Sequence, residues 1–420
     1  MLQLRVSSQT VSGLEVNLAE QLPEFPLAFL RGTGGLVGWG EAARLEASGA
    51  KRFEELAQQW RNLVAESLVT DSVQQPGSGL VAFGSISFAP DSEATSLLVI
   101  PEFVLGVRDQ TIWFTQISRS DQPQRETSEI ISMLGGFAPY RDETGVELKP
   151  GLVTGEGFTA AVSEAVSRIS SGELEKVVLA RDLVGVAPRE FDLRPVLGRL
   201  SRQYPTCWVY SVDGTFGASP ELLVRVAHGQ ISARVLAGTA GRGTDPGIDQ
   251  AIGTALSSSH KNIEEHRFAV ESLVAALEPF CSHVDADPRP FSLSLPNVWH
   301  LASDVYGVLR ENISSLDLAG ALHPTAAVAG TPRETAQALI SELEPLDRGR
   351  YAGPVGWIGA DGDGEWAIAL RGAQVEDGVI RAIAGCGIVA ESEPEAELAE
   401  TELKFQPIRN ALNRDSAKPR

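Results

Sequence analysis

Three or four strand-like segments follow one another between Leu80 and Ser118, with no helical segment among them. They are rich in apolar and β-branched residues, and turns that contain Asp, Pro or Gly separate them, reading APDSEAT and VRDQT. Consecutive strands joined by short turns pair antiparallel, because a parallel pair needs a long crossover, usually a helix. This stretch therefore predicts antiparallel sheet and argues against a doubly wound parallel sheet.

The rest of the 420-residue chain alternates irregularly between helical and strand-like patterns. Apolar residues recur at helical spacing in four stretches that we expect to be helices: 53–64, 157–171, 193–204 and 257–277. β-branched runs predict further strands, among them EKVVLARDLVGV, CWVYSVDG and EWAIALRGAQV. We predict an α+β fold, a large single domain in which antiparallel sheets pack together with helices on the outside. Its expected parts are a strand-rich N-terminal part (1–150), a second part (151–412) and a polar tail (413–420).

Composition limits the class of protein. With 55 acidic against 35 basic residues, the formal net charge of −20 argues against nucleic-acid binding, which needs clustered Lys and Arg. Cys207, Cys281 and Cys386 lie far apart without CxxC spacing, as is typical of buried thiols in a reducing compartment. The N-terminus lacks the pattern of a signal peptide, and no apolar run is long enough to span a bilayer. We expect a cytoplasmic protein that binds neither nucleic acid nor membrane.

The stretch from Ala382 to Phe405, AIAGCGIVAESEPEAELAETELKF, changes from a strand into a helix. On the strand, Gly385 and Gly387 leave room for a ligand beside the backbone. Ser392 and Glu395 predict a capping box, and the proline between them falls in the first helical turn.

Three charged residues of this predicted helix, Glu397, Glu400 and Lys404, share one face because residues three or four apart are neighbours. Two adjacent carboxylates are suited to holding a cation. A solvated acidic surface is the commoner explanation for a Glu-rich helix, so this pattern alone does not identify a site.

Other candidate residues are weak evidence when taken singly. Lys176 begins a strand, where a Lys usually faces solvent. Arg371 lies within an apolar strand, and a buried guanidinium needs an anionic partner. Glu221 follows Ser-Pro in a predicted turn, FGASPELLVRV. A histidine in a position like that of His300 is usually an ordinary core residue, and one in a position like that of His323 is usually an ordinary loop residue. Neither position alone indicates a catalytic group.

Taken together, eight ordered motifs resemble the chorismate-utilising enzymes, strongly over 155–412 and loosely before that. The motifs are KVVLAR, FGASPELLV, LAGT, KNIEEH, WHL, HPTAAVAG, ALRGA and GCGIV…EAELAET. Within this family the chain is most similar to the isochorismate synthases of menaquinone, siderophore and salicylate pathways. Lys176 matches the members that add water, whereas the members that use ammonia generally carry Gln there. HPT at 323–325 agrees with this, while Ala326 departs from the usual Pro.

The resemblance implies a role for each candidate residue. It implies one Mg²⁺ held by the carboxylates of Glu265 and Glu397, with Glu400 contacting the ion directly or through water. It implies eight substrate-binding residues: Thr239, His300, Ala327, Tyr351, Arg371, Gly385, Gly387 and Lys404. It also implies that chorismate is the small-molecule substrate and that residues 151–412 form the chorismate-binding region, in a monomer or weak dimer.

The same resemblance implies a mechanism with an acid and a base. Neutral Lys176 takes a proton from the water that attacks C2 of chorismate, and protonated Glu221 gives a proton to the departing C4 hydroxyl. Two alternatives stay open from sequence: a salicylate synthase, which goes on to eliminate pyruvate, and a non-catalytic chorismate-binding subunit.

Overall fold

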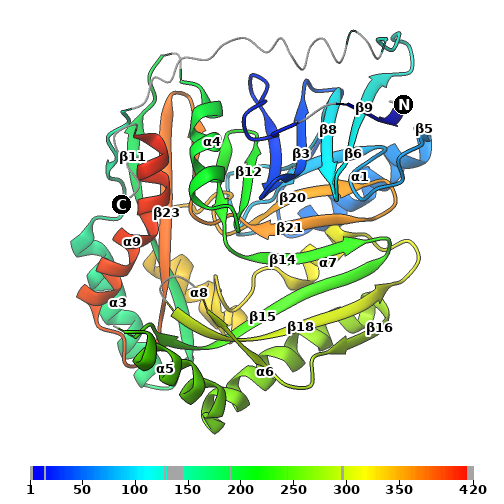
Figure 1. The fold of residues 1–420 in the computed structure, drawn as a ribbon. Coiled ribbons are helices and arrows are strands. Elements are labelled where there is room, and N and C mark those ends of the chain that lie inside the picture. The colour runs from blue at the N-terminus through cyan, green and yellow to red at the C-terminus, as the bar shows by residue number, and fades with distance from the viewer. Residues whose placement is uncertain are drawn as a thin grey trace. The chain divides into compact units, whose positions relative to one another are not determined.

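The structure is a computed structural model that describes residues 3–13, 16–126, 129, 145–189, 191–243, 245–294 and 298–413. The chain forms two compact units (Figure 1). The first unit comprises Met1–Glu221, His323–Ala360 and Ala367–Arg420, and the second comprises Leu222–Leu322 and Asp361–Trp366.

Thirteen of the described strands form one sheet within the first unit. In spatial order they are β10 (Lys149–Pro150), β11 (Lys176–Val186), β23 (Val379–Ile388), β22 (Gly372–Glu376), β13 (Thr215–Ser219), β12 (Trp208–Val212), β2 (Leu27–Arg31), β3 (Gly34–Trp39), β8 (Phe103–Arg108), β9 (Thr111–Arg119), β1 (Leu4–Thr10) and β5 (Leu68–Asp71), while β19 (Gly330–Thr331) pairs with β11. Neighbours along this order pair antiparallel, except that β1 and β5 run parallel.

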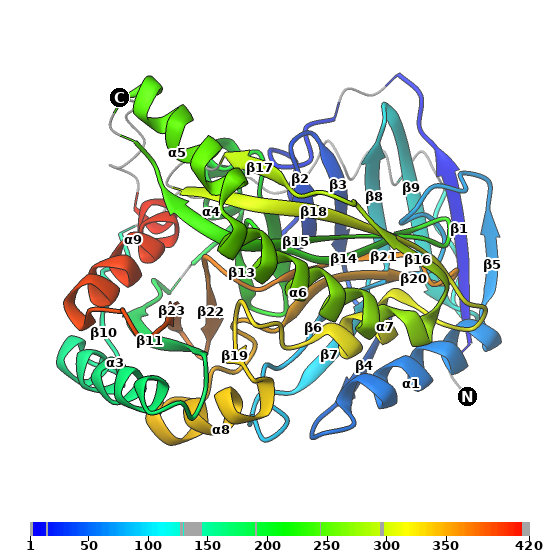
Figure 2. The same ribbon diagram turned by 90° about the horizontal axis from the view of Figure 1, so that it is seen from below.

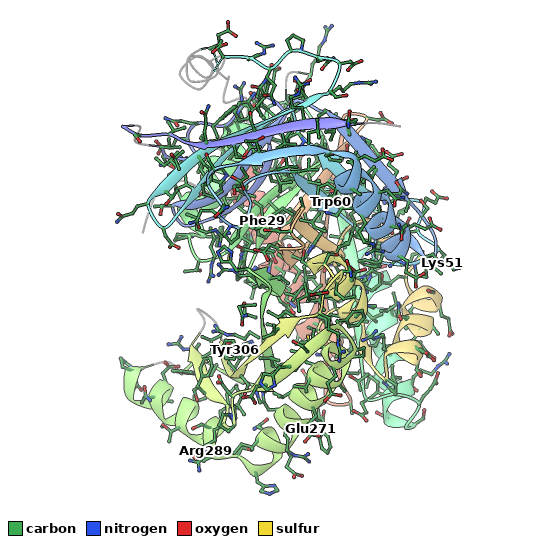
Figure 3. All side chains as sticks on the ribbon, turned by 90° about the vertical axis from the view of Figure 1, so that its right-hand side faces the viewer. Phe29, Lys51, Trp60, Glu271, Arg289 and Tyr306 are labelled. Carbon is green, nitrogen blue, oxygen red and sulfur yellow. The ribbon has the colours of Figure 1, made fainter. Side chains whose placement is uncertain are left out.

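A further set of strands in the first unit contacts the first sheet. Its order is β20 (Pro354–Gly359), β6 (Val81–Ser85), β7 (Ser96–Ile100) and β4 (Ala43–Ala47). β12 contacts both β6 and β20, so apolar side chains are buried between the two sets of strands. Figure 3 labels two buried aromatic side chains of this unit, Phe29 of β2 and Trp60 of the helix that follows β4.

Five described helices belong to the first unit: α1 (Arg52–Glu66), α3 (Gly155–Ser170), α4 (Leu193–Gln203), α8 (Arg333–Leu343) and α9 (Pro394–Leu412). α9 packs on β23 and contacts both α3 and α4 (Figure 1). Leu200 of α4 and Phe405 and Ile408 of α9 are buried in one hydrophobic cluster with Phe216 and Ile380 of the sheet. This core fixes α9 against the strand that precedes it.

The second unit contains most of the remaining elements. Its strands are β14 (Leu222–Ala227), β15 (Gln230–Gly241), β16 (Cys281–Ala286), β17 (Phe291–Ser294) and β18 (Val298–Leu309), and β21 (Gly364–Ile368) runs from it into the first unit. Its helices are α5 (Pro246–Ser258), α6 (His260–Leu277), the 3-10 turn η1 (Glu278–Phe280) and α7 (Ser315–Leu322). α5 and α6 lie along β15 and β18 (Figure 2).

The α+β class and the antiparallel pairing predicted from sequence are confirmed. The run between Leu80 and Ser118 contains β6, β7, β8 and β9, and each of the pairs β6–β7 and β8–β9 is antiparallel. The four expected helices are present as α1, α3, α4 and α6, with ends shifted by a few residues. No helix among the described residues is long and apolar enough to cross a membrane.

Two local predictions are wrong. FGASPELLVRV is not a turn: it holds β13 and β14, which flank Pro220 and Glu221. EWAIALRGAQV is not one strand, because it breaks between β21 and β22, where Arg371 has a φ of 52°. In both places the pattern of residue types is strand-like, but the backbone turns from one pairing to another.

Candidate active site

The face of α9 that carries the predicted carboxylates is well defined. The helix begins at Pro394 as expected. The prediction of a capping box is wrong, because no side chain caps the N-terminus of the helix. The Ser392 hydroxyl instead donates to Glu397 Oε1 at 2.6 Å. This hydrogen bond holds one carboxylate in place, and the carboxylate retains lone pairs, since it has about four sites in all.

Lys404 connects this face of α9 to β23. Its Nζ forms an ion pair with Glu400 Oε1 at 2.6 Å, four residues away, and donates to the Gly385 carbonyl at 2.8 Å. The predicted shared face of Glu397, Glu400 and Lys404 therefore borders the glycine-containing end of β23.

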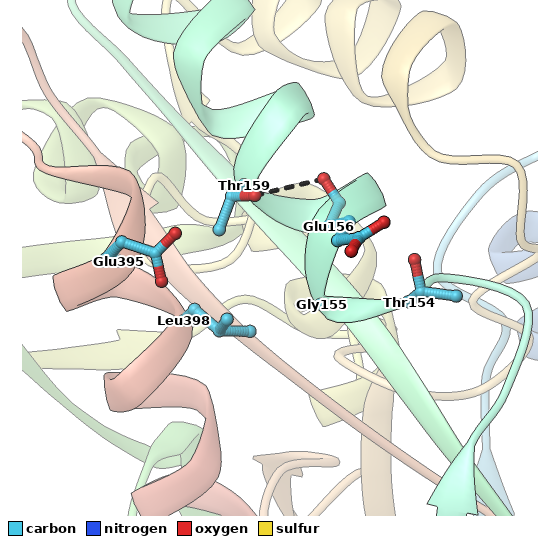
Figure 4. A pocket seen from close by; sticks show the side chains of 6 residues that line it. All are labelled: Thr154, Gly155, Glu156, Thr159, Glu395 and Leu398. Carbon is cyan, nitrogen blue, oxygen red and sulfur yellow. Dashed lines mark hydrogen bonds between the residues drawn. The ribbon is translucent and has the colours of Figure 1, made fainter.

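A shallow hollow lies on another face of α9. Figure 4 shows its lining residues: Thr154, Gly155, Glu156 and Thr159 at the start of α3, and Glu395 and Leu398 of α9. At about 100° per residue, Glu395 and Leu398 point away from Glu397 and Glu400. The hollow is therefore not formed by the predicted carboxylate face.

Lys176 is the first residue of β11, and its half-buried side chain extends over Gly387 of β23. A Cβ at Gly387 would lie 2.7 Å from Lys176 Cε, so any larger residue would displace the lysine. A Cβ at Gly385 would lie 2.5 Å from the Leu179 carbonyl oxygen. Close packing within the sheet thus accounts for both glycines, and their predicted contact with a ligand stays a prediction.

Glu221 lies in the break between β13 and β14 and is held by its backbone. Its N–H donates to Ser219 Oγ at 3.2 Å, and its carbonyl accepts from the Ile368 N–H at 3.1 Å. The Ser219 hydroxyl also donates to the Ile368 carbonyl at 2.6 Å. These contacts fix the backbone from which the Glu221 side chain projects.

The charges around Glu221 identify its neighbours. Burial raises the pKa of the Glu221 carboxyl, and Lys176, Arg371 and Lys404 act in the opposite direction. The net shift is upward even with three cations close enough to oppose it, so desolvation is the larger effect. The structure therefore brings Glu221, the predicted acid, near Lys176, the predicted base. Arg371 and Lys404, which are predicted to bind the substrate, lie near it as well.

Arg371 occupies the break between β21 and β22. Burial lowers the pKa of its guanidinium, while Tyr351 and Glu400 raise it, which places both of them in its surroundings. The preceding carbonyl, that of Leu370, accepts from the Tyr210 hydroxyl at 3.0 Å. The left-handed backbone turns the side chain out of the strand ladder, and among the described residues no carboxylate lies within ion-pair distance of the guanidinium.

Tyr351 completes this group of residues. Burial raises the pKa of its phenol to about 12, while Arg348 and Arg371 act to lower it. The hydroxyl therefore stays protonated at neutral pH and can donate a hydrogen bond to an anion.

The HPT segment has a structural role at His323. The His323 ring lies between the rings of Phe53 and Phe88, and its Nε2 donates to the Phe88 carbonyl at 2.9 Å. Burial lowers the pKa of His323 to about 3, so the ring is neutral. Ala327, four residues later, is exposed and stays a predicted pocket residue.

Three predicted site residues belong to the second unit. His300 of β18 pairs in register with Thr239 of β15, and both are held in this ladder. Glu265 lies on α6, but the side chains of Glu265 and Thr239 are outside what the structure describes. Within the described residues no group of three His, Cys, Asp or Glu is arranged to hold a metal ion. The roles of Thr239, Glu265 and His300 stay predictions.

Sequence reasoning missed a buried ion pair beside the site, that of Glu344 and Arg348. The only sequence signal for this pair was the i,i+4 spacing of two opposite charges. That spacing is common on protein surfaces, and here the two residues lie just beyond the end of α8.

Comparisons with known proteins identify the family. A profile of the family described as "Chorismate binding enzyme" matches residues 28–413, which run through both compact units, in agreement with one large domain. The isochorismate synthase MenF of Bacillus subtilis is 31% identical over 401 residues, covering 90% of this chain and 85% of that protein.

Two solved structures are similar over almost the whole chain. The menaquinone-specific isochorismate synthase MenF from Escherichia coli superimposes with a TM-score of 0.76 at 25% identity, covering 98% of this chain and 95% of the other. A 2,3-dihydroxybenzoate-specific isochorismate synthase, described as putative, from Bacillus anthracis gives a TM-score of 0.70 at 30% identity, covering 94% and 97%.

Proposed function

The chain belongs to the chorismate-binding enzyme family, and we propose that it is an isomerase that converts chorismate to isochorismate. The observation that carries this function is that Glu221, whose pKa burial raises, lies within electrostatic reach of Lys176. A raised carboxyl pKa and a nearby amine supply the acid and the base that exchange of one hydroxyl for another requires. A subunit that only bound chorismate would have no need of either.

The proposed reaction exchanges one hydroxyl for another and needs no oxidant or reductant. Water attacks C2 of the ring and loses a proton to neutral Lys176 Nζ. The C4–O bond breaks as the protonated Glu221 carboxyl gives its proton to the departing oxygen, which leaves as water. The double bonds of the ring shift accordingly, and the enzyme ends with protonated Lys176 and ionised Glu221.

The proposed substrate contacts use the remaining charged groups of the first unit. Arg371 and the Tyr351 hydroxyl bind the carboxylate of the pyruvyl ether, and Lys404 lies at the edge of the pocket. Arg371 and Tyr351 are half-buried, which supports this assignment, because a guanidinium or phenol withdrawn from water gains most from an anionic partner. Thr239, His300, Ala327 and the backbone near Gly385 and Gly387 are assigned to the pocket by resemblance.

The carboxylates of α9 are suited to Mg²⁺. Glu397 is half-buried and Glu400 exposed, they stand three residues apart, and Mg²⁺ prefers a few carboxylate oxygens together with water and an anionic substrate. We propose that both hold the ion, with Glu265 as a third ligand on resemblance alone. When bound, the ion would supply positive charge that orients the ring carboxylate of the substrate.

Replacing Glu397 by Gln is expected to raise the Mg²⁺ concentration needed for half-maximal activity. We expect a shift of at least about 10–100-fold, the loss typical of mutating residues that only support metal ligands, because Glu397 is proposed to be a ligand itself. The measurement is a titration of activity with Mg²⁺, and Glu395→Gln, on another face of α9, is the matched control. Full wild-type activity in excess chelator would overturn the metal proposal.

The product itself tests the proposed function. With chorismate and Mg²⁺ we expect isochorismate to accumulate with little pyruvate, because the residues assigned to the ring, such as Ala327 and Val328, resemble those of isochorismate synthases. Chromatography identifies the product, and a lactate dehydrogenase assay with and without added isochorismatase measures pyruvate. Stoichiometric pyruvate and salicylate fluorescence without isochorismatase would assign a salicylate synthase. Chorismate binding without any product would assign a non-catalytic subunit.

A further inference from the structure

Glu344 and Arg348 form a buried ion pair in the first unit, with 3% of each side chain exposed. The pair is bidentate: Arg348 Nε donates to Glu344 Oε2 at 2.8 Å, and Arg348 Nη2 donates to Glu344 Oε1 at 2.6 Å. The guanidinium also lies 4.5 Å from the ring centroid of Phe88. Such a pair is costly to desolvate, so its remaining contacts matter.

Those remaining contacts are with backbone atoms of β11. Arg348 Nη2 donates to the Val178 carbonyl at 2.7 Å, and Glu344 Oε1 accepts from the Ala180 N–H at 2.7 Å. Both groups lie on the edge of β11 that faces away from β23.

This edge of β11 is paired at both ends but not between them. β19 pairs with Lys176 and Val177, and β10 pairs with Leu183 and Val184. Among the described residues no strand pairs with β11 between these two stretches. The ion pair therefore takes the place of a strand where the sheet would otherwise leave a buried carbonyl and a buried N–H without partners.

The pair also fixes two segments that carry predicted site residues. Arg348 Nη1 donates to the Val328 carbonyl at 2.9 Å, which immediately follows Ala327. The Arg348 carbonyl accepts from the Tyr351 N–H at 3.0 Å. One guanidinium thus connects the strand that begins with Lys176 to the loop that contains Ala327.

We propose that Glu344 and Arg348 are positioning residues that set the placement of Lys176 relative to the substrate. The inference rests on the proposed function, since it takes Lys176 as the base. The pair touches neither substrate nor reacting atoms; it acts through Val178, two residues from Lys176. A misplacement of about 1 Å can cost about 10²-fold in rate, so the catalytic effect is large enough to measure.

The test is a double-mutant cycle with Arg348→Lys and Lys176→Ala, read as kcat and KM for chorismate. Lys keeps the charge but has three donors and no planar fork, so it cannot make the bidentate pair with Glu344 and both carbonyl contacts at once. We expect Arg348→Lys to lower kcat about 10–100-fold with a much smaller change in KM. In the Lys176→Ala background the same substitution should cost less than about two-fold, because the residue it positions is gone.

The matched control is Arg168→Lys, an arginine of α3 whose partners Glu164, Glu173 and Glu342 are surface carboxylates. It should leave kcat unchanged. Equal losses in both backgrounds, or wild-type kcat in Arg348→Lys, would overturn the inference. Absence of isochorismate from the wild-type protein would instead overturn the proposed function, and the wild type is therefore assayed first.

Glu344→Gln provides a second route if Arg348→Lys does not fold. Gln keeps the size of Glu344 and an oxygen acceptor for the Ala180 N–H, while the bidentate pairing is lost. The same non-additivity with Lys176→Ala is expected. If circular dichroism shows that neither variant folds, the pair serves folding and the positioning role is rejected.

Discussion

Replacement of Lys176 by Ala is expected to lower kcat by about 10²–10⁴-fold, the usual contribution of a positioned general base. Chorismate should still bind, because the carboxylate contacts are assigned to other residues. The fold should also persist: Lys176 is half-buried, and its aliphatic stem contacts Gly387, which Ala leaves uncrowded. The measurement is kcat and KM with chromatographic detection of isochorismate.

Two further substitutions separate the amine from the packing of its stem. Lys176→Met keeps an apolar stem over Gly387 but has no amine, and it should lose as much activity as Lys176→Ala. Lys149→Ala removes an exposed lysine of β10 in the same sheet and should leave kcat within about two-fold of the wild type. Near wild-type turnover in Lys176→Met would show that Lys176 is not the base.

The parts of the fold that sequence could predict are those with a local cause. β6 to β9 follow from alternating apolar segments and polar turns, and α9 begins at Pro394 because proline suits the first helical turn. The capping box fails at the same place. Its spacing allows Ser392 to cap the helix, but the hydroxyl bonds to the Glu397 carboxylate instead. Spacing identifies possible partners and cannot choose between them.

The strand breaks around the site were not predictable for a related reason. ALRGA reads as strand because its side chains are apolar, yet Arg371 takes a left-handed φ of 52°. Nothing in the residue types marks this break, since arginine has no preference for that conformation. It follows from tertiary contacts, including the Tyr210 hydroxyl at the Leu370 carbonyl.

The residues of the site likewise fall into those that sequence could predict and those that it could not. Ordered motifs assign Lys176, Glu221 and Arg371 by resemblance, and the structure adds that the charges of Lys176 and Arg371 both act on Glu221. Sequence reasoning could not assign a role to Glu344 and Arg348, because that role depends on hydrogen bonds to backbone atoms that are distant in the chain. Position 180 lies 164 residues from Glu344 in the chain. That contact depends on how β11 and α8 pack, which no local pattern encodes.

The pH dependence of Glu221→Gln offers the sharpest test of the acid. In the wild type the working form has a proton on Glu221 and none on Lys176. At low pH the pair binds a second proton, and at high pH it loses the last one. We therefore expect a bell-shaped dependence of kcat/KM on pH, whose two limbs belong to the coupled pair.

Removing the carboxyl should change both the rate and the shape of this profile. Gln cannot donate a proton to the leaving oxygen, so kcat should fall about 10²–10⁴-fold. Only Lys176 then titrates, and it works as a base when neutral. Activity of Glu221→Gln should therefore rise with pH to a plateau, without the decline at high pH. The measurement is kcat/KM across the pH range over which the protein stays folded, beside the wild type.

The matched control is Glu376→Gln, which removes an exposed carboxylate at the end of β22 and should keep the wild-type bell. The expected loss of the high-pH limb has a physical basis in the structure. Burial raises the pKa of Glu221 against the opposing effect of Lys176, Arg371 and Lys404, so the protonated acid persists to higher pH than for an ordinary carboxyl. As pH rises through the upper apparent pKa of the coupled pair, the wild type loses its last proton and with it the acid, whereas the Gln variant has no acid to lose. A Glu221→Gln enzyme with a wild-type rate, or with an unchanged bell, would place the acid at another residue.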